Sequence, residues 1–298
     1  MLTMKNGSGW AFSGIVAAIA LTGVAFQAVA EEKKPPAAKA LVKPAVKAPV
    51  KAPAQKPPAK KPVVAKAVPP PPSPGQLFLA GMTALNKGNP VAAIKNFEAA
   101  STGGNSEAEN MLGTIYYSGR GVKQDYRKAA VAYEKAASHG HLLAATKLAD
   151  MADAGHGMPK DYAKAAHWYG YASQRGFVTA QVKYGGLYER GDGIGQSDAE
   201  AAEWYSRAAA QNQWDAQHRL GRLYVAGRGV PQDATRAAEL FLASAKNGNS
   251  FAKISLGDLY AAGNGVAQDE ARALQLYREA AKDGEPLAKE RLKALGKL

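Results

Sequence analysis

The stretches LGTIYYSG (residues 112–119), LGRLYVAG (220–227) and LGDLYAAG (256–263) decide the fold of this chain. In each, a Leu, a second Leu or Ile, and a Tyr recur at intervals of three and four residues, which places them on one face of an α-helix. A glycine-rich turn follows, as in GRGVKQD (119–125), and then an alanine-rich segment with an aromatic residue, as in KAAVAYEKAA (128–137). The pattern predicts two helices joined by a tight turn.

This pair of helices recurs every 36 residues. The interval is kept by glycines that end the first helix, by alanines, and by one aromatic residue in each second helix. The glycines are Gly119, Gly155, Gly191, Gly227 and Gly263; the alanines are Ala108, Ala144, Ala180, Ala216, Ala252 and Ala288; the aromatics are Phe97, Tyr133, Tyr169, Tyr205, Phe241 and Tyr277. Such self-similarity is typical of solenoids. We therefore predict an all-α fold, an α/α superhelical solenoid of helical hairpins, over residues 75–298.

The repeated motif resembles the Sel1-like repeat family. LGxLYxxGxGV, then Asp, paired alanines and a closing Gly make up a motif that recurs, with local departures, in five copies over about residues 108–288. Residues 76–107 look like a related tetratricopeptide unit, because Gly81 and Ala93 are 12 residues apart, four fewer than the equivalent pair in the next copy. The resemblance implies a superhelix that serves as an adaptor or scaffold for other proteins.

Two residues depart from the repeat pattern, and the last segment is expected to close the stack. Asp198 lies one place later than the aspartate expected to cap each second helix. Asn212 replaces the glycine that closes a unit. Residues 286–298 are expected to form a capping helix, with Leu292 and Leu295 packing inward, because no partner helix follows.

The N-terminal residues 1–30 have the three parts of a secretory signal peptide. Lys5 gives a positive charge, an apolar stretch runs from Trp10 to Phe26, and small residues precede a predicted cleavage site after Ala30. We expect a periplasmic or secreted protein. The alternative is that the stretch is retained as a membrane anchor, although it is short for a spanning helix.

Residues 31–74 are predicted to be a disordered basic linker. They hold 13 prolines, ten lysines and ten alanines, and they carry most of the net charge of +13. Proline and the lack of large apolar side chains oppose folding. The linker is interpreted as a spacer; the alternative is electrostatic binding to an anionic envelope polymer or membrane. No nucleic-acid partner is expected, because no aromatic residues lie between the lysines to stack on bases.

The sequence predicts no catalytic residue, no cofactor and no metal site. There is no cysteine. The histidines His139, His141 and His156 lie in turns of consecutive repeats, which stacking can bring near one another, but no HExxH pair or carboxylate cluster accompanies them. The paired glycines lack the strand and the GK[ST] of a phosphate loop, and no serine lies in a GxSxG motif. The family resemblance leaves an enzyme acting on β-lactams or cell wall as a less favoured alternative, since this chain has neither the family's cysteines nor an SxxK motif.

We predict protein binding on the concave side, which is formed mainly by the first helices. This suits a periplasmic adaptor that assembles or regulates envelope or secreted-polymer machinery; the alternative is a structural envelope protein tethered by its linker. A polar wall with some aromatic residues suits a peptide or protein partner. The candidate residues are Asn110, Tyr117, Asp150, Asp153, Glu189, His218, Arg222 and Asp258, with Trp214 in a turn beside them.

Overall fold

A computed structural model describes residues 70–297, in which all regular structure is helical. The predicted signal peptide and all but the end of the predicted linker lie outside the described residues. The helices are α1 (Pro74–Asn86), α2 (Pro90–Thr102), α3 (Ser106–Ser118), α4 (Tyr126–Ser138), α5 (Leu142–Ala154), α6 (Tyr162–Gln174), α7 (Val178–Arg190), α8 (Asp198–Ala209), α9 (Trp214–Ala226), α10 (Ala234–Lys246), α11 (Ser250–Ala262), α12 (Glu270–Lys282) and α13 (Pro286–Ala294).

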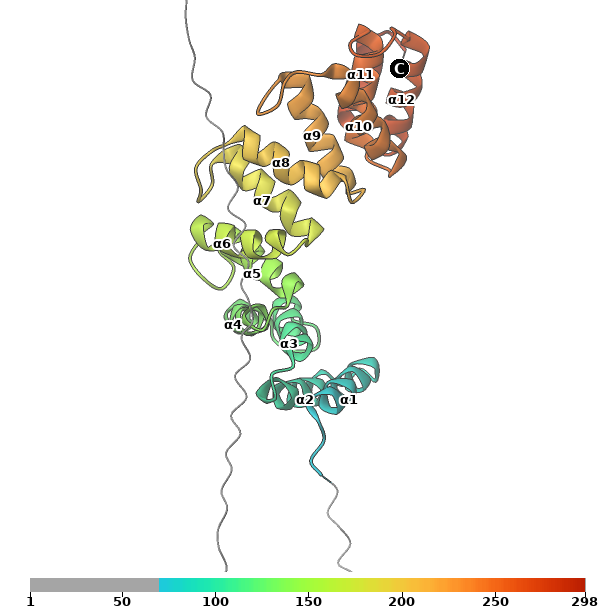
Figure 1. The fold of residues 1–298 in the computed structure, drawn as a ribbon. Coiled ribbons are helices and arrows are strands. Elements are labelled where there is room, and N and C mark those ends of the chain that lie inside the picture. Colours follow the sequence, from blue (N-terminus) through green and yellow to red (C-terminus); the bar gives the residue numbers. More distant parts are fainter. Residues whose placement is uncertain (1–69, 298) are drawn as a thin grey trace, which may run out of the picture. The chain divides into compact units, whose positions relative to one another are not determined.

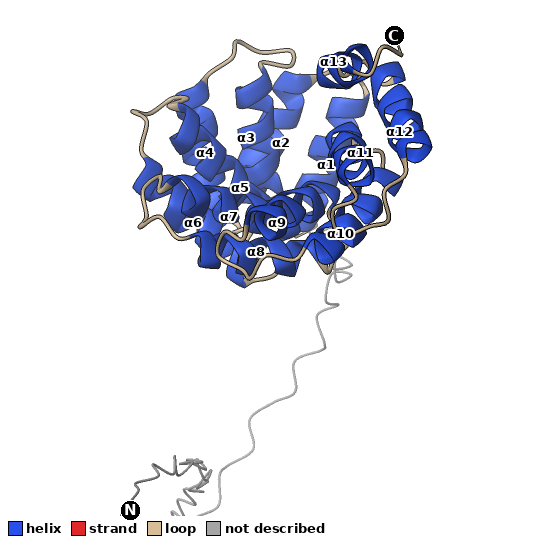
Figure 2. Cartoon of the chain, turned by 90° about the horizontal axis from the view of Figure 1, so that it is seen from above, coloured by secondary structure: helices blue, strands red, loops and turns tan. Residues whose placement is uncertain are grey.

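The helices form hairpins that stack in chain order. Each helix packs against the one before it and the one after it, and the hairpins follow one another from α1–α2 to α11–α12 (Figure 1). The first helices α3, α5, α7, α9 and α11 lie toward the inside of the curve, and the second helices α4, α6, α8, α10 and α12 lie toward its outside (Figure 2). The predicted all-α superhelical solenoid is confirmed.

Each second helix begins at an N-cap side chain that the turn supplies. In α4, for example, Asp125 accepts a hydrogen bond from the backbone amide of Lys128 at 3.0 Å. In α8 the cap is Ser197, whose hydroxyl accepts from the amide of Glu200, while Asp198 is the first helical residue. The late aspartate therefore leaves the register unchanged, because serine caps a helix about as well as aspartate.

Two glycines in each turn have different physical roles. The first ends the inner helix in a left-handed conformation, as Gly155 does at φ +76°. The second, such as Gly157 at φ +75°, lies against the start of the preceding second helix, where a Cβ would come within 2.5 Å of the Tyr126 carbonyl group. Asn212, at φ +60°, is the one described residue other than glycine with a positive φ, and asparagine tolerates that conformation.

The core consists of six clusters, each built around one ring of the aromatic row and packed with alanines and larger aliphatic side chains. The six members of the aromatic row are at most 2% exposed. Glycines in the inner helices make room for the rings: a Cβ on Gly221 would lie 2.6 Å from the Phe241 ring. At the end of the stack Leu292 is buried, as predicted, but Leu295 is 38% exposed. The expectation for Leu295 was wrong because α13 ends at Ala294, which leaves Leu295 at the C-cap.

The described unit begins slightly earlier than the sequence suggested. Ser73 caps α1 with a capping box in which its hydroxyl accepts from the amide of Gln76 and the Gln76 side chain accepts from the amide of Ser73. A shortened chain that keeps this cap must therefore start before residue 73. Between residues 70 and 297, no helix combines the length and the apolar character needed to cross a membrane.

Candidate functional site

The candidate site is the inner wall, defined here as the surface formed by α3, α5, α7, α9 and α11. Its carboxylates are held in place by hydrogen bonds within a repeat and by ion pairs with the following segment. Asp150 on α5 accepts a hydrogen bond from the Tyr169 hydroxyl at 2.5 Å and forms an ion pair with Lys183 of the next repeat at 2.9 Å. Burial, and then the negative charge of Asp150, raise the pKa of Tyr169, so its phenol stays protonated and donates.

The same arrangement recurs at the other end of the stack. Asp258 accepts from the Tyr277 hydroxyl at 2.7 Å and pairs with Arg291 at 2.9 Å. In the third repeat Glu189, one turn further along its helix, accepts from the Tyr205 hydroxyl at 2.9 Å. These carboxylates thus join neighbouring helices and also present negative charge on the inner wall.

An apolar pocket opens between the starts of α9 and α11. It has a volume of about 370 Å³ and is lined by Trp214, His218, Arg222 and Phe251, among others. Trp214 is 46% and Phe251 is 52% exposed, large fractions for aromatic side chains. We call this the Trp214–Phe251 pocket.

The His218 imidazole in this pocket is neutral at physiological pH. Burial, with the nearby charge of Arg222, lowers its pKa from 6.5 to about 4. Its Nε2 lies 3.2 Å from the Ser255 hydroxyl, and its ring packs against Phe241 and Phe251 at 5.6 and 6.4 Å between centroids. The imidazole therefore adds a polar, uncharged edge to an aromatic surface.

Two further pockets continue along the inner wall. One, of about 270 Å³, brings together the predicted residues Glu189, Arg222 and Asp258. The other, of about 300 Å³, includes Asp153 with Lys183. The structure thus gathers seven of the nine candidate residues onto the stretch of wall from α5 to α11.

The remaining two candidates are placed differently. Asn110 is only 7% exposed, and its Oδ1 has no hydrogen-bond partner among the described residues. Tyr117 is half-buried in an aromatic cluster: its hydroxyl lies 3.3 Å from Nδ1 of His156, and its ring is 5.1 Å from that of Tyr126. Both side chains offer a partner less surface than the sequence pattern suggested.

Four further residues line these pockets and were not among the predicted candidates. They are Lys183, Arg219, Phe251 and Arg228. A signal for two of them was present, because Lys183 and Arg219 occupy the same repeat position, 36 residues apart. Phe251 follows the first residue of an inner helix, and Arg228 lies within a glycine turn, so only the folded arrangement shows that they face the same groove as Arg222.

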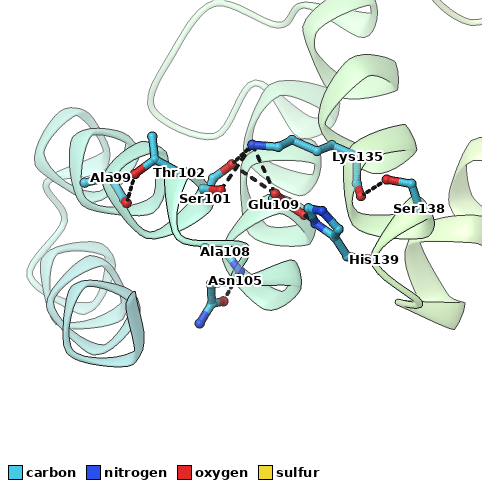
Figure 3. Close-up of polar contacts among 9 residues, drawn as sticks. All are labelled: Ala99, Ser101, Thr102, Asn105, Ala108, Glu109, Lys135, Ser138 and His139. Carbon is cyan, nitrogen blue, oxygen red and sulfur yellow. Dashed lines mark hydrogen bonds and ion pairs between the residues drawn. The ribbon is translucent and has the colours of Figure 1, made fainter. Parts of the chain in front are cut away.

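A buried charged cluster lies where the first hairpin meets the second (Figure 3). Glu109 on α3 is 1% exposed; its carboxylate lies 3.2 Å from Lys135 and 2.7 Å from Nδ1 of His139, and it accepts from the Ser101 hydroxyl at 3.1 Å. Lys135 also donates to the Ser101 hydroxyl and carbonyl oxygens at 2.7 and 3.1 Å. The cluster joins α2, α3 and α4, so we assign it to the packing of this junction.

The histidines that the sequence singled out do not converge. His139 contacts Glu109, His141 contacts Glu107 at 3.2 Å, and His156 packs on Tyr126. In the part of the chain that the structure describes, no three side chains of the metal-ligating kinds gather in one place.

Comparison with known proteins gives a consistent result. The Sel1 repeat profile matches five consecutive segments, residues 106–141, 142–177, 178–213, 214–249 and 250–285. No curated protein sequence matches the chain closely enough to count as a relative.

Two crystal structures resemble the chain closely. One is a protective antigen present in uropathogenic Escherichia coli strains that displays an SLR fold: it has a TM-score of 0.69 and 32% identity, with 74% of this chain and 48% of that protein covered. The other is a Sel1 repeat protein from Oxalobacter formigenes, with a TM-score of 0.68 and 31% identity, covering 72% of this chain and 88% of that protein. The chain thus spans about half the length of the Escherichia coli protein.

Proposed function

Because the chain belongs to the Sel1 repeat family, whose repeats are generally protein–protein interaction modules and typically non-catalytic, we propose that it is a scaffold of the bacterial envelope that binds partner proteins on its inner wall. In this proposal it assembles or regulates envelope or secreted-polymer machinery. The predicted signal peptide and the predicted basic linker support a periplasmic or secreted location.

The Trp214–Phe251 pocket is the main observation in favour of the inner wall as the binding surface. Trp214 and Phe251 expose large aromatic surfaces beside the neutral His218 and the exposed Arg222. Tryptophan and arginine are enriched among the residues that dominate binding energy at interfaces. A repeat stack that needed these side chains only for its core would have buried them, as it buries Phe241.

The test is an affinity capture from envelope extract with three proteins: residues 31–298, residues 70–298, and residues 70–298 carrying Trp214→Ala. The second keeps the Ser73 cap but lacks most of the linker. We expect the first two to recover the same partner at low and moderate salt, because the linker acts as a spacer. We expect Trp214→Ala to lose that partner.

The second candidate function is a structural envelope protein held by its linker, which the ten lysines of residues 31–74 favour. It predicts the opposite pattern. Only residues 31–298 would then be retained by envelope material, moderate salt would release them because exposed charges are screened, and Trp214→Ala would have no effect.

A further inference from the structure

One repeat lacks the tyrosine hydrogen bond found in the others and has a donor at the acceptor position of the inner wall. In the other four Sel1 repeats, the aromatic residue of the second helix is a tyrosine whose hydroxyl donates to the inner helix. The donor–acceptor pairs are Tyr133–Thr114, Tyr169–Asp150, Tyr205–Glu189 and Tyr277–Asp258. The fourth repeat has Phe241 instead, and Arg222 occupies the position equivalent to Asp150 and Asp258. A guanidinium cannot accept a hydrogen bond, so a tyrosine at position 241 would have no acceptor there.

Arg222 also has no carboxylate partner among the described residues, unlike the other arginines of this region. It is exposed, and it forms no ion pair with any residue between 70 and 297. The carboxylates that line the neighbouring pocket, Glu189 and Asp258, are each already engaged by a tyrosine hydroxyl and an arginine. The two other arginines nearby, Arg219 and Arg228, pair with carboxylates of their own.

The surroundings of Arg222 are apolar enough to strengthen an ion pair. The Trp214–Phe251 pocket includes Arg222 and both aromatic rings. His218 is on α9 and contacts Ser255 of α11; its imidazole is neutral near pH 7 and adds no second positive charge. Arg219 and Asp215 also line this pocket, but they pair with each other at 3.0 Å. Arg222 is therefore the guanidinium of the pocket that is left for a bound carboxylate, beside two aromatic rings, where charge-assisted hydrogen bonds are stronger than in water.

We propose that this pocket binds an extended acidic segment of a partner protein, with an Asp or Glu side chain on Arg222 and a neighbouring apolar side chain against Trp214 and Phe251. The inference rests on the proposed protein-binding function and specifies its ligand. Arginine suits this role because its planar guanidinium donates two parallel hydrogen bonds to a carboxylate.

The carboxylate comes from a side chain within the segment rather than from a chain end. Arg222 lines two pockets, the Trp214–Phe251 pocket on one side and the pocket with Glu189 and Asp258 on the other. A pocket therefore lies on each side of Arg222. A peptide that binds through an internal side chain can occupy both pockets, whereas a peptide that binds through its terminal carboxylate needs only one.

The test uses a random peptide library with amidated C-termini, panned against the chain. Dissociation constants of enriched peptides are then measured by fluorescence anisotropy, beside versions with Asn or Gln in place of each Asp or Glu. The protein variants are Arg222→Gln and, as a control with the same change in charge, Arg120→Gln in an exposed turn. A double variant, Arg222→Asp with Phe241→Tyr, rebuilds the Tyr–Asp pair of the second and fifth repeats and guards against loss of fold.

We expect the library to yield acidic residues next to apolar ones. Arg222→Gln and the amide peptides should each weaken binding by roughly 10- to 100-fold, the range of a charge-assisted hydrogen bond. The two changes together should weaken it no further than one alone, because they remove the same interaction. Arg120→Gln should change affinity less than about twofold. The double variant should stay folded by circular dichroism and lose the acidic peptides.

Three results would overturn the inference. The first is a set of enriched peptides without an acidic residue. The second is an effect of Arg222→Gln no larger than that of Arg120→Gln. The third is binding that requires a free C-terminal carboxylate in a parallel library. If such peptides still depend on Trp214, the proposed protein-binding function stands and only the acidic ligand is refuted. If no peptide binds and envelope capture also fails, both are refuted.

Discussion

The second glycine of each turn offers a direct test of how the repeats are held together. Gly157 has φ +75°, and a Cβ at this position would lie 2.5 Å from the Tyr126 carbonyl carbon and oxygen and 2.8 Å from the Arg127 nitrogen. All three atoms belong to backbone at the start of α4, so no side chain can rotate away. Gly157→Ala therefore forces the repeats apart or bends the turn.

The matched control is Gly176→Ala in the same repeat. Gly176 has φ +83°, but nothing lies within 4 Å of its potential Cβ. Both substitutions place alanine in the left-handed region, which destabilises the folded state by about 1–2 kcal/mol. Both restrict the unfolded chain equally, which cancels in the comparison. Only Gly157→Ala adds the steric overlap, typically about 1–3 kcal/mol. We expect losses of about 2–5 kcal/mol for Gly157→Ala and about 1–2 kcal/mol for Gly176→Ala.

The assay is urea unfolding followed by far-ultraviolet circular dichroism, with a thermal melt of each protein. At the size of this folded unit, the expected difference lowers the melting temperature of Gly157→Ala below that of Gly176→Ala by roughly 2–12 °C. Equal destabilisation by the two substitutions would falsify the close approach of the turn to α4. It would show that positive φ alone accounts for the glycine.

Other substitutions test separate parts of the structure. Glu109→Gln should lower the free energy of unfolding by about 1–3 kcal/mol, because it weakens the contacts of a buried carboxylate. Glu107→Gln, at an exposed side chain, should change the free energy of unfolding by less than about 0.5 kcal/mol; urea unfolding measures both. Ser73→Ala should remove about 1 kcal/mol from α1, seen as faster hydrogen exchange there; unchanged exchange would exclude the capping box. The pKa of His218 is lowered from 6.5 to about 4 in the folded state. As the pH falls from 6.5 to 4, the imidazole is therefore protonated in the unfolded state but not in the folded state, and the free energy of unfolding should fall by on the order of 3 kcal/mol. In His218→Gln this part of the pH dependence should vanish; an unchanged slope would contradict a buried neutral imidazole.

The sequence by itself determined the repeat and its secondary structure. A 36-residue interval kept by glycines, alanines and aromatics has one physical explanation, because each helical hairpin must bury its apolar face against the next. The helix caps were also predictable from the sequence: Asp125 and its equivalents start the second helices at the positions that the turn pattern predicted. These features depend on contacts between residues close in sequence, which local pattern encodes.

The tertiary structure decided which polar side chains are available to a partner. Asn110 and Arg222 were both candidates for the inner wall, yet the first is buried and the second is exposed without an ion pair. Asp258, a third candidate, accepts a hydrogen bond from Tyr277 and pairs with Arg291. Exposure and pairing depend on how far the superhelix turns between repeats. That rotation is set by packing across the whole interface, so no single repeat of the sequence reveals it.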